Sequence, residues 1–404
     1  MRFDLHLRRD VGDRVQALAT RMGAWEHQAR ISPEDERNIR ARVRGFSHCQ
    51  RASPLAVAGV DGSGDFPALA YSDSFVYISV AAGALFVDDA VSGLREVPLG
   101  IPSIAEFTWL PGSQAAAAPL WDEAFAALAG LPVSEVVEQS DYRELKAIAC
   151  GRTQRVATLV AKLLRPKASD AGNVGIQLRS SAEAGAALRI IESRHRLDYV
   201  LIDGTLSLPM VARDGDSLFQ EHLKRLCAVR ARQKGAALVA ISKSHGLPGV
   251  EEIERIAGEV VGTGARDTEH WFLRLPGPRE GWQLPLTDGR RIPPDGAVSY
   301  LARFHRTTPV LRIDIDAGFW SEHVEGAAGP GGNIEEERFF ERLDYCTHDQ
   351  RAFGYPYPVK AGHDRASLTE AERLALRKQV IDAAVASGMS RRLFRDPSIA
   401  TGHG

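Results

Sequence analysis

The chain has 404 residues, of which 44% are hydrophobic and 25% are charged. These proportions are ordinary for a globular protein with a buried core, and they exclude intrinsic disorder, collagen and a coiled coil. Lys and Arg number 50 and Asp and Glu number 52, so the net charge is -2. Any contact with nucleic acid must therefore come from a local patch or from a partner.

The cysteine pattern and the apolar segments indicate the compartment. Cys49, Cys150, Cys227 and Cys346 lie far apart with no CxxC pair, so we expect buried, reduced thiols rather than a zinc ribbon or a disulfide scaffold. The N-terminus mixes charges and lacks the apolar run of a signal peptide. The longest nearly apolar stretch, 76–87, is shorter than the roughly 20 residues of a membrane-spanning helix. We therefore expect a cytoplasmic protein without a membrane contact.

The first part of the chain predicts helices followed by strands. Residues 1–53 predict a polar, helical N-terminal extension, in which Ser32-Pro33 begins a helix. The apolar run from Leu55 to Val60 ends at Asp61-Gly62, which predicts a buried strand and then a tight turn. Further segments complete a three-stranded antiparallel meander: 66–71, 74–80 and 83–87.

The remainder predicts alternating helices and strands. Residues 114–193 are mostly helical, with an amphipathic stretch at 142–164 and a helix at 181–194. A strand, a helix capped by Ser217 and a second strand follow at 197–202, 217–234 and 236–241, which indicates parallel strands joined by a right-handed crossover. The C-terminal third predicts strands at 270–275, 298–305 and 309–315, helices at 333–343 and 368–386, a Ser367 cap, a flexible segment at 326–332 and a rigid loop at 353–358.

Two buried strands end in Asp-Gly followed by a hydroxyl residue, at Asp61 and at Asp203. A buried carboxylate is costly without a partner, although Asp-Gly also makes good turns and each could be structural. A meander followed by helix, strand, helix and strand is the order of the RNase H-like fold, an α/β mixed sheet flanked by helices. Its first and fourth strands are neighbours, so Asp61 and Asp203 would meet and hold Mg²⁺ or Mn²⁺.

A third carboxylate has two candidates, Glu183 and Glu192. The helix at 181–194 runs antiparallel to the strand after it, and both span roughly 20 Å. Glu183 would thus return to Asp203, while Glu192 would stay at the far end. Glu183 could equally complete a helix-capping box with Ser180, and on geometry alone the two roles are about even.

Three further polar residues are candidates on the same edge of the sheet. Lys243 ends the next strand, where it could hold a phosphate or simply be solvated. Tyr355 and His363 follow in the Gly-Tyr-Pro-Tyr-Pro loop. A tyrosine can orient a phosphate or stack on a base, and a histidine can bind a metal or transfer protons. Taken alone, each of these residues could be structural.

Four motifs in this order resemble those of the NurA nucleases. They are Val60-Asp61-Gly62-Ser63, Ile202-Asp203-Gly204-Thr205-Leu206, Ile241-Ser242-Lys243-Ser244, and Gly354-Tyr355-Pro356-Tyr357-Pro358 through His363. The resemblance covers residues 54–390 and leaves 391–404 as a C-terminal tail. It implies an RNase H-like core and a Mn²⁺-dependent nuclease that cuts single-stranded DNA as endo- and exonuclease and duplex DNA from the 5′ side. The implied partners in end resection are DNA, a second copy of the chain and a hexameric HerA-type ATPase.

The resemblance also implies roles for single residues. Asp61, Glu183, Asp203 and His363 would bind the metal, Lys243 and Tyr355 would complete the catalytic site with them, and Thr205 stands where serine is more usual. Two other functions fit the sequence: a non-catalytic RNase H-like adaptor that docks on a motor ATPase, and a metal-dependent enzyme acting on RNA or a small phosphoester. Cleavage assays with Mn²⁺ on each substrate separate these readings.

Overall fold

The computed structural model describes residues 8–28, 31–50, 52, 54–89, 93–142, 144–145, 171–206, 218–243, 249–262, 269–276, 296–325 and 334–396. The strands are β1 Arg44–Gly45, β2 Leu55–Tyr71, β3 Ser74–Asp89, β4 Gly93–Val97, β5 Ile104–Pro111, β6 Tyr199–Asp203, β7 Ala237–Ser242, β8 Trp271–Arg274, β9 Ala297–Arg303, β10 Leu311–Asp316 and β11 Phe394–Arg395. The α-helices are α1 Arg9–Gln28, α2 Pro33–Arg42, α3 Gln114–Ala129, α4 Val133–Gln139, α7 Ala171–Glu192, α8 Phe219–Gln233, α9 Val250–Gly262, α10 Ala317–Trp320, α11 Ile334–Tyr345, α12 Tyr357–Ala366 and α13 Glu370–Ala386.

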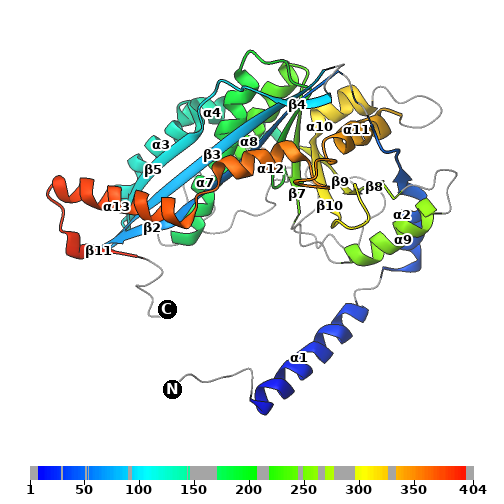
Figure 1. The fold of residues 1–404 in the computed structure, drawn as a ribbon, viewed down its shortest axis with the longest axis horizontal. Helices are drawn as coiled ribbons and strands as arrows, with labels where there is room; N and C mark the ends of the chain where they lie inside the picture. Colours follow the sequence, from blue (N-terminus) through cyan, green and yellow to red (C-terminus); the bar gives the residue numbers. More distant parts are fainter. Residues whose placement is uncertain are drawn as a thin grey trace.

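The strands form a single mixed sheet, which Figure 1 shows with helices packed along it. β2 pairs antiparallel with β3, and β3 pairs antiparallel with β5. β2 also pairs parallel with β6, which pairs parallel with β7. The spatial order β5-β3-β2-β6-β7 therefore places the first strand of this core beside the fourth, which confirms the predicted RNase H-like mixed sheet. Beyond β7, the strands β10, β9, β8 and β1 extend the sheet in antiparallel pairs.

The predicted turn after Val60 is wrong. β2 continues through Asp61 to Tyr71, and Asp61 pairs with Ala82 of β3. The chain turns instead at Ser72, whose φ is 55°. Gly62 does not form a turn but allows α7 to pack closely on β2, because a Cβ on this residue would lie 3.3 Å from the Cβ of Glu183 on α7. The meander consequently contains two long strands where shorter ones were predicted.

The two faces of β2 carry different helices. Ala58 and Val60 belong to a core shared with α7, α8 and α3, whereas Val57 belongs to a core shared with α11 and α12. This alternation is the two-residue period of a strand, and it places α7 and α12 on opposite faces of β2. Each large apolar side chain buried in these cores contributes about 1.5–3 kcal/mol.

Several predicted segment boundaries also need correction. The helix that was predicted to begin at Ser181 begins at Ala171. Glu183 therefore lies inside α7, and the capping-box interpretation is wrong. The last long helix is capped by Thr369 with Glu372 rather than by Ser367. The loop at 353–358 leads directly into α12, a helix that was not predicted.

Other predictions are confirmed or lie outside the described residues. Ser32 caps α2 by accepting a hydrogen bond from the backbone N–H of Asp35. The parallel pair β6 and β7 and the strands β8, β9 and β10 lie where they were predicted. The segments 146–164 and 326–332 and the predicted cap Ser217 lie outside the described residues.

The first strand and the last strand along the chain both join the sheet. β1 pairs with β8, and β11 pairs with β2. Figure 1 shows α1 standing apart from the sheet, whereas α2 packs on α9. The boundaries at 53 and 390 stay predictions. Within the described ranges, none of the helices combines the length and hydropathy needed to cross a bilayer.

Candidate active site

The two aspartates lie side by side because of the register between β2 and β6. These strands are parallel, and Val60 stands opposite Ile202. The next residues are Asp61, which is 4% exposed, and Asp203, which ends β6. Burial first, and then the charge of Asp61, raise the pKa of Asp203, so the two carboxylates interact electrostatically. The two aspartates are therefore neighbours, as predicted, although Asp61 lies within β2 and only Asp203 ends its strand.

Glu183 of α7 joins this pair, and Glu192 does not. The pKa of Glu183 is raised well above its ordinary value, first by burial and then by Asp61 and Asp203. Its Oε1 is buried and has no hydrogen-bond partner among the described residues. Glu192 lies at the other end of α7, where its side chain is 44% exposed and 3.7 Å from Arg230. The structure thus selects Glu183 over Glu192 as the third acid of the cluster.

The three acids have the donor chemistry of a site for a hard divalent cation. Burial first, and then Asp61, raise the pKa of Asp203, while Lys243 and Arg179 act in the opposite direction. Desolvated like charges of this kind are stable as carboxylates only when a cation neutralises them. Carboxylate oxygens are the ligands that Mg²⁺ and Mn²⁺ prefer. Asp61, Glu183 and Asp203 would hold the ion, and the unpartnered oxygen of Glu183 offers it a free ligand.

His363 reaches the cluster from α12. Its Nδ1 lies 2.7 Å from Oδ2 of Asp61, and its side chain is 51% exposed. α12 packs unusually close to β2, because a Cβ on Gly59 would lie 2.0 Å from the carbonyl carbon of Pro358 and one on Gly362 would lie 3.1 Å from the backbone nitrogen of Asp61. His363 is thus positioned by a helix rather than by the predicted loop.

Tyr355 and Lys243 complete the cluster from the same face. Nζ of Lys243 lies 3.7 Å from the centre of the Tyr355 ring, a distance at which a cation–π contact is favourable. Burial first, and then the charges of Asp203, Asp61 and Glu183, raise the pKa of Tyr355. Its hydroxyl therefore stays protonated at neutral pH and can donate a hydrogen bond.

Two basic residues near the acids were not predicted. Arg179 lies one turn before Glu183 on α7 and lowers the pKa of both Glu183 and Asp203, and Lys224 of α8 lowers that of Glu183. The spacing of four residues between Arg179 and Glu183 was the available signal. The hydroxyl of Thr205 donates to the carboxylate of Asp314 inside the sheet.

Fold and site together define an α/β protein of the RNase H-like class with an acidic cluster where two parallel strands lie side by side. The chain is similar to the crystal structure of the NurA nuclease from Sulfolobus solfataricus, at 12% identity over 95% of this chain and 99% of that chain, with a TM-score of 0.45. It is also similar to the crystal structure of NurA bound to dAMP and manganese, at 12% identity over 96% of this chain and 99% of that chain, with a TM-score of 0.37. For the endonuclease V structure from Bacillus subtilis, the identity is 9% over 86% of this chain and 92% of that chain, with a TM-score of 0.31. No protein-family model and no curated protein matches the sequence.

Proposed function

We propose that this protein is a metal-dependent nuclease that hydrolyses phosphodiester bonds. The observation that carries the proposal is the electrostatic coupling of Glu183 to Asp61 and Asp203, which lie on neighbouring parallel strands, together with a buried Glu183 oxygen that has no hydrogen-bond partner among the described residues. Asp61, Glu183 and Asp203 would hold a divalent ion, which would supply an activated water and stabilise the leaving oxygen.

The neighbouring side chains would perform the remaining steps. His363 orients the Asp61 carboxylate through their hydrogen bond, and its half-exposed ring can accept or donate a proton on the substrate side. Lys243 places a positive charge where the scissile phosphate would lie. The protonated hydroxyl of Tyr355 donates a hydrogen bond to a phosphate oxygen. Together they position the phosphate against the acids.

The substrate, ion and partners of the proposed nuclease follow from the motif resemblance. We propose DNA as the substrate, cut as a single strand by endo- and exonuclease action and as a duplex from the 5′ end, with Mn²⁺ as the ion. A homodimer working with a hexameric HerA-type ATPase in end resection fits a chain whose net charge is only -2, because such a nuclease can take DNA affinity from its partner.

The test compares Asp61→Asn and Asp203→Asn with wild type in the presence of Mn²⁺. Cleavage of single-stranded DNA, duplex DNA and RNA is measured, and each substitution should reduce DNA cleavage by at least about 100-fold. Glu192→Gln changes an acid that lies on α7, like Glu183, but outside the cluster, and this variant should keep full activity. Full activity in Asp61→Asn would reject the site. Cleavage of RNA alone would reject the DNA substrate, and a wild type that cuts nothing, alone or with its ATPase, would support an adaptor.

A further inference from the structure

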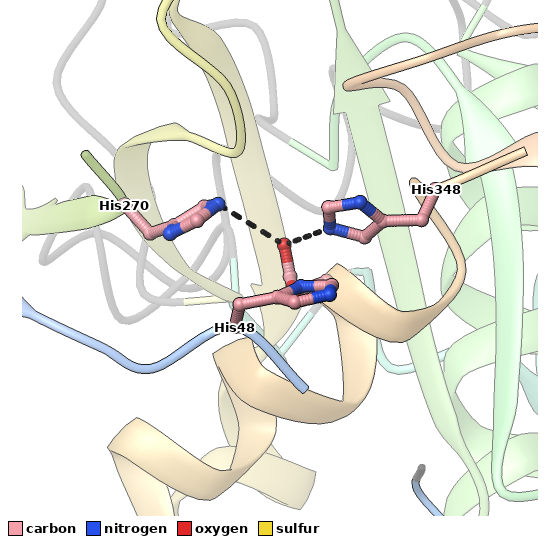
Figure 2. Close-up of side chains that lie close together, drawn as sticks. His48, His270 and His348 are labelled. Atoms are coloured by element: carbon pink, nitrogen blue, oxygen red, sulfur yellow. Dashed lines mark hydrogen bonds and ion pairs between the residues drawn. The ribbon is translucent and has the colours of Figure 1, made fainter. Parts of the chain in front are cut away.

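A second group of metal-binding side chains lies outside the acidic cluster. His48, His270, Asp344 and His348 each present one ligand atom, and these atoms all lie within 4.8 Å of one another. Figure 2 shows the three imidazoles gathered close together, and each has a ring nitrogen within 4 Å of the Asp344 carboxylate. None of these residues belongs to the motifs that point to the nuclease.

Three separate segments bring the group together. His48 follows the edge strand β1, His270 immediately precedes β8, and Asp344 and His348 lie at the end of α11 and four residues further on. Pairing of β1 with β8 fixes the first two segments. Phe46 packs against His270, Phe272 and Phe340, with ring centres 5.5, 6.2 and 5.8 Å away, so an apolar layer lies beneath the group.

Asp344 is the centre of the arrangement. Its side chain is fully buried, with Nδ1 of His48 at 2.8 Å, Nε2 of His348 at 2.9 Å and Nε2 of His270 at 3.9 Å from its oxygens. The backbone N–H of Cys49 donates to Oδ2 of Asp344 at 2.9 Å. A backbone hydrogen bond of this kind orients a carboxylate that binds a metal.

We propose that His48, His270, Asp344 and His348 bind one Zn²⁺ ion. Three imidazole nitrogens and one carboxylate oxygen are a four-coordinate donor set that suits Zn²⁺, whereas Mg²⁺ and Mn²⁺ favour oxygen-rich sites such as the acidic cluster. Ligand atoms about 2.0–2.1 Å from a tetrahedral zinc stand roughly 3.3 Å from each other. The distances from the Asp344 oxygens to the three imidazole nitrogens, 2.8, 2.9 and 3.9 Å, bracket this value, and all the ligand atoms lie within 4.8 Å of one another, so rearrangement of the side chains alone would admit the ion.

The ion would have a structural role, because four protein ligands leave no open position for a substrate. It would fasten the segment after β1 to β8 and to the end of α11. The turn that follows α11 also holds the active-site loop: the backbone N–H of Gly354 donates to the carbonyl of Thr347, and that of Tyr357 donates to the carbonyl of Cys346, both at 2.8 Å. Zinc would thereby steady the loop that contains Tyr355.

The experiment measures metal content and thermal unfolding of the full-length protein. The purified chain is stripped with a chelator, incubated with ZnCl₂, freed of excess ion and analysed by elemental mass spectrometry. Wild type should retain one zinc per chain, and its unfolding midpoint should rise when zinc is restored. Asp344→Asn and His348→Ala should lose the bound zinc, and His48→Gln, at a half-exposed position, does so with the least risk to folding. Circular dichroism verifies the fold of each variant.

Two further variants serve as controls for zinc binding. His323→Ala removes an exposed histidine elsewhere, and Asp61→Asn disables the acidic cluster; both should retain the zinc. The proposal would be overturned if wild type retains no zinc and its unfolding midpoint does not change when zinc is added. The four side chains would then form a hydrogen-bonded cluster without a metal. Zinc retained in full by folded His48→Gln and His348→Ala, or zinc lost in Asp61→Asn, would also overturn the proposal. Because metal content is measured without a nuclease substrate, these results do not depend on the proposed nuclease activity.

Discussion

Replacing Glu183 by Gln should make the metal-free protein more stable while abolishing the proposed nuclease activity. Burial and the neighbouring Asp61 and Asp203 raise the pKa of Glu183 from its ordinary value of 4.5. Between that value and the raised pKa, the folded protein keeps a proton that the unfolded chain has lost. Folding stability then decreases as the pH rises, by at most about 1.4 kcal/mol per pH unit from this one group. Gln does not titrate, so the variant lacks this slope.

The assay is urea unfolding at a series of pH values in the presence of a chelator. Wild type should lose stability as the pH rises above 4.5, the ordinary pKa of a glutamate, and Glu183→Gln should show a flatter profile and exceed wild type at high pH. Glu192→Gln, at the exposed end of the same helix, should follow wild type. If Glu183→Gln shows the wild-type slope, or is less stable than wild type at every pH, then Glu183 is not a desolvated acid beside two others.

Three further substitutions test other parts of the structure. Lys243→Met should reduce the cleavage rate by about 10²–10³-fold, measured under single-turnover conditions, because it removes the charge placed for the phosphate. Gly59→Ala should lower the unfolding free energy by about 1–3 kcal/mol and reduce activity, because the added Cβ lies 2.0 Å from the carbonyl carbon of Pro358 and displaces α12. Arg225→Ala should cost about 3–5 kcal/mol in urea unfolding, because it removes a buried partner 2.9 Å from the buried Asp316.

Each of these substitutions has a matched control. Lys234→Met changes a lysine whose Nζ bonds the carbonyl of Ser193 at the surface, and it should leave cleavage unchanged. Gly12→Ala adds a Cβ inside α1 where no atom lies within 4 Å, and it should stabilise by about 0.5–1 kcal/mol. Arg306→Ala removes a side chain that is 69% exposed and should change stability by less than about 0.5 kcal/mol. Equal effects in a control and its test variant would contradict the structural reason given.

Strand order could be predicted from the sequence because hydrophobic periodicity and chain order determine it. The parallel pairing of β2 with β6 follows from a meander succeeded by strand–helix–strand, and it brings Asp61 to Asp203. The end of a strand is less predictable. Asp-Gly-Ser-Gly at 61–64 has the composition of a turn, yet here it continues β2, and Gly62 makes room for α7 packed on the strand.

Contacts between distant segments were the least predictable part. Glu183 could be selected only by a length argument, and its capping-box alternative failed because α7 includes residues well before Ser181. The helix carrying His363 was missed because its prolines suggested a rigid loop, although a proline is favourable in the first turn of a helix. The histidine cluster was missed for a related reason: His48 and His270 are far from Asp344 in the chain, and only the spacing of four residues to His348 is a local signal.

The close contact between α12 and β2 has a consequence for how the chain tolerates change. Main chain meets main chain at Gly59 and Gly362, so the distance from His363 to Asp61 does not depend on the volumes of intervening side chains. Substitutions in the apolar interior elsewhere would shift the outer helices relative to the sheet, whereas β2 and α12 would keep their relative position. Sequence variation across most of the core is thereby separated from the alignment of the Asp61 and His363 side chains, and the strictest demand falls on two residues that have no side chain.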